Sequence, residues 1–186
     1  METIMLNSIG GVELSSVAKG FETADAMLKT AKVELLLSRS VCPGKYLILV
    51  AGLVADVNAA VEAGAGKAAH SLVDSFSIPN IHPEVFPAIA GTAPAGELES
   101  LGVIEAFSVS ALIEAADAAI KSASVKLLEI RLAMALGGKA FVTLTGTVAA
   151  VETAVSAGAA VISKKGLLVE KVVIPQPRQE ILRELI

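Results

Sequence analysis

Apolar and polar residues follow one another along this chain in short blocks of two kinds of periodicity. The range Gly11–Leu14 predicts a short strand. The apolar positions after it step by 4, 3, 4 and 3 residues, which is the spacing of one helix face. They are Val17, Phe21, Ala24, Leu28 and Ala31. Ser15 or Ser16 stands before them as the expected N-cap. The pattern therefore predicts a strand followed by an amphipathic helix.

The pattern then changes to two β-rich runs and a second helix. Residues 33–37 and 46–50 are rich in branched apolar residues and predict two strands. A turn is expected at Gly52, and a last strand over Leu72–Ile78. The inner face expected for the helix between them consists of Val54, Val57 and Val61. The order βαββαβ predicts a ferredoxin-like α+β unit, with a four-stranded antiparallel sheet and both helices on one face.

The whole pattern occurs twice along the chain. Alignment of Glu13 with Glu105 gives an offset of 92 residues, and alignment of Gly44-Lys45 with Gly138-Lys139 gives an offset of 94. The second copy therefore carries two additional residues just before its Gly-Lys pair. Its helix faces repeat those of the first copy, with Val109, Ile113, Ala116, Ile120 and Ala123 in one helix and Val148, Val151 and Val155 in the other.

The duplication predicts two domains, at residues 1–90 and 100–186. Between them, residues 84–99 contain Pro87, Gly91, Pro94 and Gly96 and are expected to form the linker. In each domain, the predicted sheet has one face without helices, and this face has to be covered by other parts of a protein. That favours an oligomer, as does a composition of 54% hydrophobic but only 3% aromatic residues. The alternative interpretation is an alanine-rich globular core.

Charge and cysteine content narrow the classes of function. The net charge of −4 comes without a basic cluster, so nucleic-acid binding is not expected. Charged residues interrupt every apolar run that is long enough to approach a membrane span. The N-terminus has no signal-peptide pattern, and a single Cys excludes an intrachain disulfide framework, so a cytoplasmic location is expected.

Catalytic patterns are missing from the sequence, so an enzyme is not expected. No nucleophile–base pair or phosphate-binding glycine loop is present, and neither His70 nor His82 lies in metal-ligand spacing with Cys42. On these residues alone, a duplicated ferredoxin-like regulatory protein that binds a small ligand remains an alternative function.

Two sequence signatures resemble a known family. Ala24-Asp25-Ala26-Met27-Leu28-Lys29 recurs as Ala116-Asp117-Ala118-Ala119-Ile120-Lys121, and a Gly-Lys pair before a strand and a Gly recurs in GKYLILVAG and GKAFVTLTG. These features resemble the shell domains of bacterial microcompartments, in the class with two tandem domains. The resemblance implies a homotrimer whose six lobes form a pseudohexameric ring. It also implies that the rings tile into flat shell facets with other shell proteins.

The resemblance also assigns roles to two lysines. Lys29 and Lys121 correspond to the lysine that lies at the edge of a tile and contacts the neighbouring tile. The alternative is a solvated lysine near a helix C-terminus, where the helix dipole favours a positive charge.

The loop between the second and third strands lines a central pore in related domains. Here the corresponding loops are Ser38–Gly44 and Ala133–Gly138, and their unequal lengths imply threefold rather than sixfold symmetry. The expected pore residues are Ser40, Val41, Cys42, Pro43 and Gly44 in the first loop and Ala135, Leu136 and Gly137 in the second.

The single cysteine lies in the first of these loops. Cys42-Pro43-Gly44-Lys45 is similar to the tandem shell proteins of propanediol-utilising compartments, and this resemblance implies one [4Fe-4S] cluster per trimer. Three symmetric thiolates can bind three irons of such a cluster, which would transfer electrons across the shell. The alternative is a plain or gated metabolite pore in which Cys42 is only a small loop residue.

Overall fold

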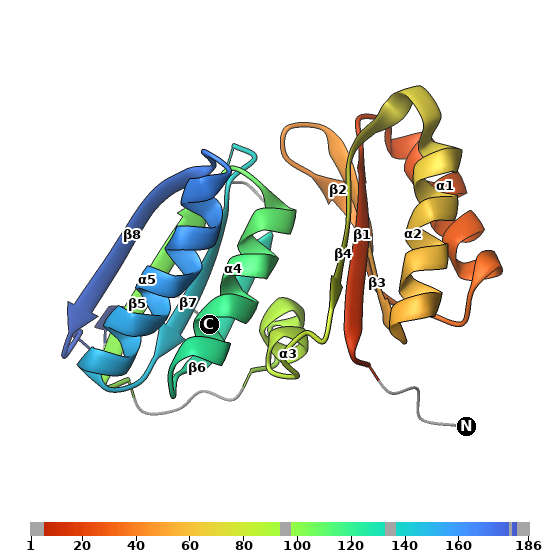
Figure 1. The fold of residues 1–186 in the computed structure, drawn as a ribbon. Coiled ribbons are helices and arrows are strands. Elements are labelled where there is room, and N and C mark those ends of the chain that lie inside the picture. The colour runs from red at the N-terminus through yellow and green to blue at the C-terminus, as the bar shows by residue number, and fades with distance from the viewer. Residues whose placement is uncertain (1–5, 94–97, 133–136, 179, 182–186) are drawn as a thin grey trace. The chain divides into compact units, whose positions relative to one another are not determined.

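The chain consists of two compact units, one ending at Ile81 and the other beginning at His82 (Figure 1). The computed structural model describes residues 6–93, 98–132, 137–178 and 180–181. Each unit contains one four-stranded antiparallel sheet.

The first unit has the predicted order of elements. Its sheet has the strand order β2-β3-β1-β4, and both helices cover one face of it (Figure 1). The elements are β1 (Ser8–Leu14), α1 (Val17–Thr30), β2 (Glu34–Val41), β3 (Lys45–Gly52), α2 (Val54–Ala68), a 3₁₀ turn (Ala69–Ser71) and β4 (Leu72–Pro79). The ferredoxin-like α+β fold is confirmed for this unit.

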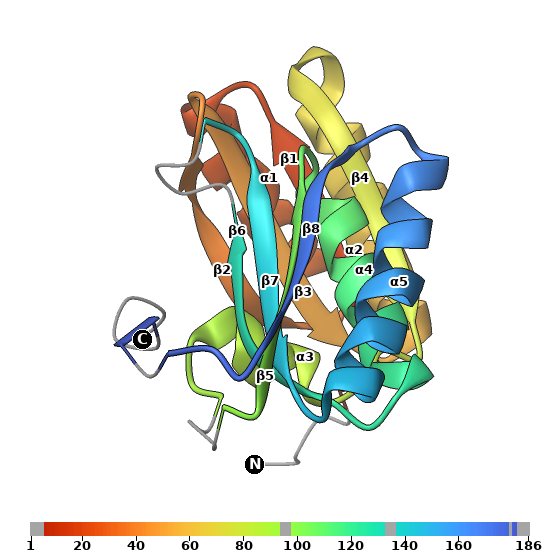
Figure 2. The same cartoon turned by 90° about the vertical axis from the view of Figure 1, so that its left-hand side faces the viewer.

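The second unit repeats this arrangement, with the strand order β6-β7-β5-β8. In Figure 2 its strands run side by side, with α4 and α5 to their right. The elements are α3 (Val85–Ala90), β5 (Ser100–Ala106), α4 (Val109–Ser122), β6 (Lys126–Leu132), β7 (Ala140–Thr145), α5 (Val148–Lys164) and β8 (Leu168–Pro175). Ser16 and Ser108 are the N-caps of α1 and α4, and each hydroxyl accepts a hydrogen bond from the backbone N–H three residues later.

Helix α3 is the main difference from the predicted linker. Residues 84–99 are rich in turn-forming residues, yet Val85–Ala90 is helical and ends at Gly91, whose φ of +68° forms a left-handed cap. Val85 and Ala88 are fully buried, and α3 packs against β6 and α4. Burial of these apolar side chains outweighs the weak helix propensity of a segment that contains Pro87.

The first sheet meets its helices through alternating strand residues. Val12, Ile48 and Val50 point to the helix side and are fully buried together with residues of α1 and α2. Gly10 allows α2 to lie close to β1, because a Cβ there would be only 2.5 Å from Cγ2 of Val61.

The expected buried face of α1 is wrong in detail. Val17, Phe21 and Leu28 are 41%, 65% and 40% exposed, whereas Ala24 is buried with Gly20, Thr23 and Met27. The apolar spacing correctly identifies a helix, but its large residues lie beside the stripe that faces the first sheet. The corresponding residues of α4 are buried.

One core contact between a helix and a strand has its large residue on the strand in the first unit and on the helix in the second. A Cβ on Gly20 of α1 would lie 2.3 Å from Cδ1 of Tyr46, so the tyrosine ring occupies the space of a side chain. At the equivalent positions the second unit has Leu112 and Ala140, both fully buried. The exchange indicates that the two positions share one volume in each core.

This exchange makes a testable prediction about stability. Gly20→Leu should lower the free energy of unfolding by about 2–3 kcal/mol through overpacking, and Tyr46→Ala by about 3 kcal/mol through cavity formation. The double variant recreates the pair of the second unit and should lose clearly less than the sum. Urea unfolding of the four proteins measures the coupling, and additive losses would contradict a shared volume.

Candidate functional site

The β2–β3 hairpin carries Cys42 at its turn. The predicted loop Ser38–Gly44 is too long, because β2 continues to Val41, which pairs with Lys45 on β3. Ser40 and Val41 therefore belong to the strand. Only Cys42, Pro43 and Gly44 form the turn, where the N–H of Gly44 donates to the carbonyl oxygen of Val41 at 3.0 Å. Gly44 has a φ of +85°, a conformation that favours glycine.

The turn presents a free thiol to the outside of the unit. Cys42 is partly exposed, Pro43 and Gly44 are exposed, and Val41 beneath them is buried. Within the described residues, no three His, Cys, Asp or Glu side chains gather as a metal site. Cys42 is also the only cysteine of the sequence. A metal centre with more than one thiolate ligand at this turn therefore requires the Cys42 residues of several copies.

The second hairpin has the same register but a longer turn. Arg131 pairs with Phe141 as Arg39 pairs with Leu47 in the first hairpin. The two additional residues therefore lie between Leu132 and Ala140, where the first hairpin has residues 41–45 between Ser40 and Tyr46. Of the expected pore residues, Ala135 and Leu136 lie outside the described part of the chain. Gly137 is exposed and has a φ of +62°.

An ion pair stands at the base of each turn. Nζ of Lys45 lies 2.8 Å from Oε1 of Glu13, and Nζ of Lys139 lies 2.6 Å from Oε1 of Glu105. Each lysine directly follows its turn, and each glutamate lies on the central strand β1 or β5. Sequence reasoning recognised the equivalent glutamates but missed their partners. The repeated Gly-Lys pair was the signal that could have revealed them.

The two predicted edge lysines each pair with an aspartate on the same helix. Lys29 contacts Asp25, and Lys121 contacts Asp117, both at 2.6 Å. The i, i+4 spacing of the Ala-Asp-Ala signature places the two charges on one side of the helix. Both charges of the first pair are exposed, whereas Asp117 is largely buried and also accepts a hydrogen bond from the N–H of His82 at 2.7 Å.

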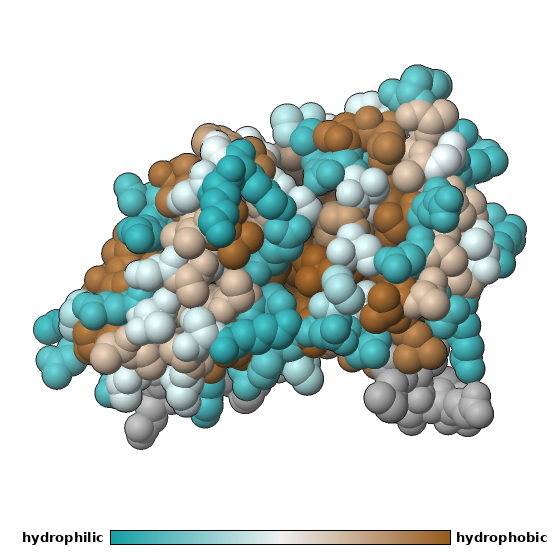
Figure 3. Space-filling view, viewed as in Figure 1, coloured by the Kyte–Doolittle hydropathy of each residue, from teal (hydrophilic) through white to brown (hydrophobic). Residues whose placement is uncertain are grey.

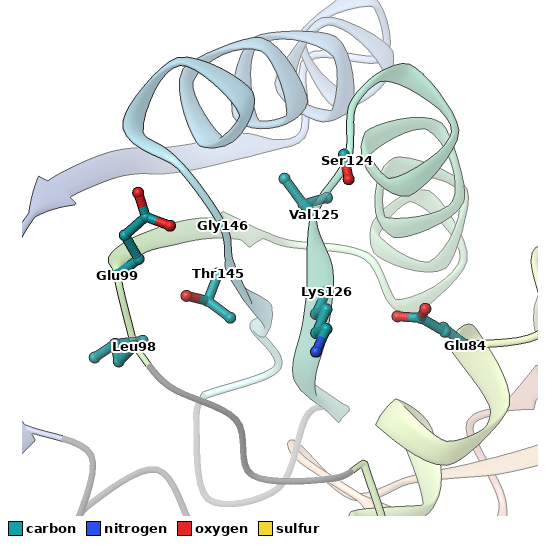
Figure 4. A pocket seen from close by; sticks show the side chains of 8 residues that line it. All are labelled: Glu84, Leu98, Glu99, Ser124, Val125, Lys126, Thr145 and Gly146. Atoms are coloured by element: carbon teal, nitrogen blue, oxygen red, sulfur yellow. The ribbon is translucent and has the colours of Figure 1, made fainter.

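A polar hollow of about 870 Å³ opens on the second unit (Figure 4). The side chains of Glu84 and Glu99 enter it from opposite sides, with Lys126 between them (Figure 4). The hydroxyl of Thr145 donates to the carbonyl oxygen of Ser100 at 2.8 Å. These residues do not form the nucleophile, base and orienting group of a catalytic site.

Apolar residues reach the surface over the first unit, where brown patches interrupt the polar surface (Figure 3). Among the helices that the structure describes, none is long and apolar enough to cross a membrane.

Fold and site together define a class of protein. The chain is a duplicated scaffold of two tandem ferredoxin-like units with exposed apolar surface. Each unit has a Glu–Lys ion pair next to its hairpin turn and an Asp–Lys ion pair on one helix. The family model of the BMC domain matches residues 8–81 and 100–177. The chain belongs to this family and is a tandem-domain shell protein of a bacterial microcompartment.

Curated relatives agree with this assignment. The bacterial microcompartment shell protein PduT of Citrobacter freundii is 42% identical over 182 residues, which cover 98% of this chain and 99% of the relative. The carboxysome assembly protein CcmO of Synechocystis is 31% identical, over 91% of this chain and 61% of the relative.

Solved structures show the same fold. A microcompartment protein from Desulfitobacterium hafniense superposes with a TM-score of 0.93 at 52% identity, covering 96% of this chain and 99% of that one. A fused permuted hexameric shell protein of the RMM microcompartment has a TM-score of 0.59 at 23% identity, covering 84% of this chain and 81% of that one. This second likeness concerns the fold alone.

The ion pair below the first turn can be tested by a double-mutant cycle. Glu13→Gln and Lys45→Met should each destabilise the protein, and their coupling energy should be about 0.5–1 kcal/mol because the pair is partly buried. Urea unfolding measures the cycle, and Glu105→Gln with Lys139→Met is the matched cycle in the second unit. A coupling of zero in both cycles would show that neither pair holds its hairpin.

Proposed function

We propose that three copies of this chain form a six-lobed ring that serves as a tile of a microcompartment shell facet. Each chain supplies two similar units, so threefold closure gives six similar lobes. The exposed apolar residues of α1 support subunit contacts, because exposed apolar surface of this kind marks interaction sites. The tiles would contact other shell proteins at their edges, in the cytoplasm of the cell.

At the centre of the ring we place the turns that carry Cys42 and propose that they hold a [4Fe-4S] cluster. The observation that supports this most is a single thiol, partly exposed at a turn that differs between the units. Because only the first unit has the cysteine, the thiols of a trimer come in a set of three, which suits ligation of three irons. When bound, the cluster supplies one-electron transfer across the tile.

The residues around Cys42 would position this thiol rather than bind iron. Pro43 restricts the backbone beside it, Gly44 leaves space for close approach of a group from outside, and Lys45 is held by Glu13. The alternative function is a tile whose pore passes metabolites and holds no cluster.

Iron analysis distinguishes the two functions. Protein purified without oxygen should be brown and contain about four irons per trimer, and Cys42→Ser should lose both the colour and the iron. Ser40→Ala, in the strand before the turn, is the matched control and should keep them. A colourless trimer without iron after anaerobic reconstitution would leave the metabolite pore as the function.

For the tile edge, we propose that Lys29 and Lys121 contact the neighbouring tile. Both ammonium groups are at least partly exposed, and each is oriented by its helix aspartate. Lys29→Asp reverses the charge and should abolish flat sheets in electron micrographs of concentrated protein while leaving single tiles intact. Lys171→Asp makes the same charge change at an exposed position of β8 and should keep the sheets. Sheets of normal order from Lys29→Asp would contradict the edge role.

A further inference from the structure

Equivalent surfaces of the two units differ sharply in burial. Phe21 of α1 is 65% exposed, whereas its equivalent Ile113 in α4 is fully buried. The contrast extends to the neighbouring strands, where Leu35 of β2 is 41% exposed and its equivalent Leu127 of β6 is 3% exposed. Val17 and Leu28 show the same contrast with Val109 and Ile120. The surface formed by α1 and β2 is therefore the uncovered counterpart of a covered one.

Part of the cover on the second unit comes from residues 82–90. Helix α3 packs against α4 and β6, and Glu84 and Pro87 line a small hollow together with Leu127. At the start of this segment, the N–H of His82 donates to Oδ1 of Asp117, whose Oδ2 contacts Lys121. The Asp117 carboxylate therefore connects residues 82–90 to α4.

The equivalent carboxylate on α1, that of Asp25, contacts a lysine but receives no backbone N–H among the described residues. Among the described residues, Asp25 contacts Lys29 alone, through Oδ2, and its side chain is 60% exposed against 12% for Asp117. The Asp25 carboxylate and the apolar residues around it therefore match the covered site of the second unit, without the segment that covers it.

The chain contains a second segment of the same kind, after β8. Pro79 pairs with Ser8 and Pro175 pairs with Ser100 at equivalent register positions. The next residues, Asn80 and Gln176, have φ values of +54° and +47°, although neither is glycine. Both strands therefore end in the same uncommon left-handed turn.

The sequences after these turns also correspond. Ile81 and Pro177 are both buried, and His82 corresponds to Arg178. Further on, the apolar residues of α3 have apolar equivalents in the sequence at the C-terminus. The pairs are Val85 with Ile181, Phe86 with Leu182, and Ile89 with Leu185, and Glu84 corresponds to Glu180. Val85 is fully buried, whereas Ile181 is 39% exposed.

We propose that the C-terminal segment from Arg178 onward docks on α1 and β2 of a second copy of this chain, with the N–H of Arg178 donating to Asp25. This inference rests on the proposed trimer and identifies the contact that closes it. Residues 82–90 follow β4 and cover the next domain along the chain. The segment that follows β8 corresponds to residues 82–90, and the open surface that matches it consists of α1 and β2. In the proposed ring this surface belongs to another copy of the chain, which gives a head-to-tail contact.

The contact has a consequence for the tile edge. Asp25 would bind the incoming segment through Oδ1 while Oδ2 holds Lys29, as Asp117 does with His82 and Lys121. Closure of the ring would therefore restrict the position of the Lys29 ammonium group at the tile edge. The ring interface and the tile contact would share the Asp25 carboxylate.

Cross-linking tests this contact directly. In a Cys42→Ser parent, Leu35→Cys and Glu180→Cys are introduced together, because their equivalents Leu127 and Glu84 line the same hollow. A short bis-maleimide should then produce covalent dimers and trimers on a denaturing gel. Replacing Leu35→Cys by Leu53→Cys, at an exposed position before α2, is the matched control and should give monomers.

A second measurement does not depend on the cross-linker. Leu35→Asp and Asp25→Ala should each raise the dissociation constant of the trimer about tenfold or more, measured by light scattering over a dilution series. Leu53→Asp should leave it unchanged, and circular dichroism reports that each variant is folded.

The outcomes separate this inference from the function proposed above. Covalent dimers and trimers, with weaker assembly of the two surface variants, support both. A trimer that gives no covalent ladder, or that is unaffected by Leu35→Asp and Asp25→Ala, overturns the docking inference and leaves the shell tile intact. A cross-link within one chain overturns the role of a second copy. Protein with Cys42 intact that stays monomeric at all concentrations overturns the trimer itself.

Discussion

Close contact between helices and sheet is the constraint on which both units depend. Gly10 and Gly102 leave no side chain on the central strand at the place where α2 or α5 crosses, and a Cβ at either position would lie less than 3 Å from a valine of that helix. Gly64 of α2 and Gly158 of α5 allow the two helices of each unit to lie close together. A Cβ on Gly64 would lie less than 3 Å from Met27 of α1, and a Cβ on Gly158 less than 3 Å from the backbone of α4. With few aromatic residues, stability must come from many short contacts of this kind.

This close packing explains how two similar units can share one framework and differ in a hairpin turn. The strands, their registers and the Glu–Lys pairs at the hairpin bases repeat between the units. Because the hairpin frame is the same, the turn itself can vary in length and composition without disturbing the sheet. The cysteine and the two additional residues both lie in this variable part. The helices α1 and α4 differ in a similar way. They share one sequence signature, but the surface beside it is buried in the second unit and exposed in the first.

The candidate site could be predicted from the sequence only in part. Cys42 stands out as the single cysteine, and the offset change from 92 to 94 locates the difference between the turns. Its extent was misjudged, because Ser40 and Val41 continue the β2 ladder and alternation alone does not show where a strand ends. The partners of Glu13 and Glu105 were missed, since a contact between strands depends on sheet order, which local periodicity does not contain.

By itself, the sequence determined the duplication, the order of strands and helices and the ferredoxin-like class, because these follow from local periodicity and from identity between the two copies. Tertiary structure decided which side of α1 faces the first sheet, that Val85–Ala90 is a helix, and that Asp117 receives the N–H of His82. In each of these cases the outcome depends on burial against residues far away in the chain. Helical spacing shows that Phe21 and Ile113 lie on a helix face, but only the packing of the rest of the protein decides that one is exposed and the other buried.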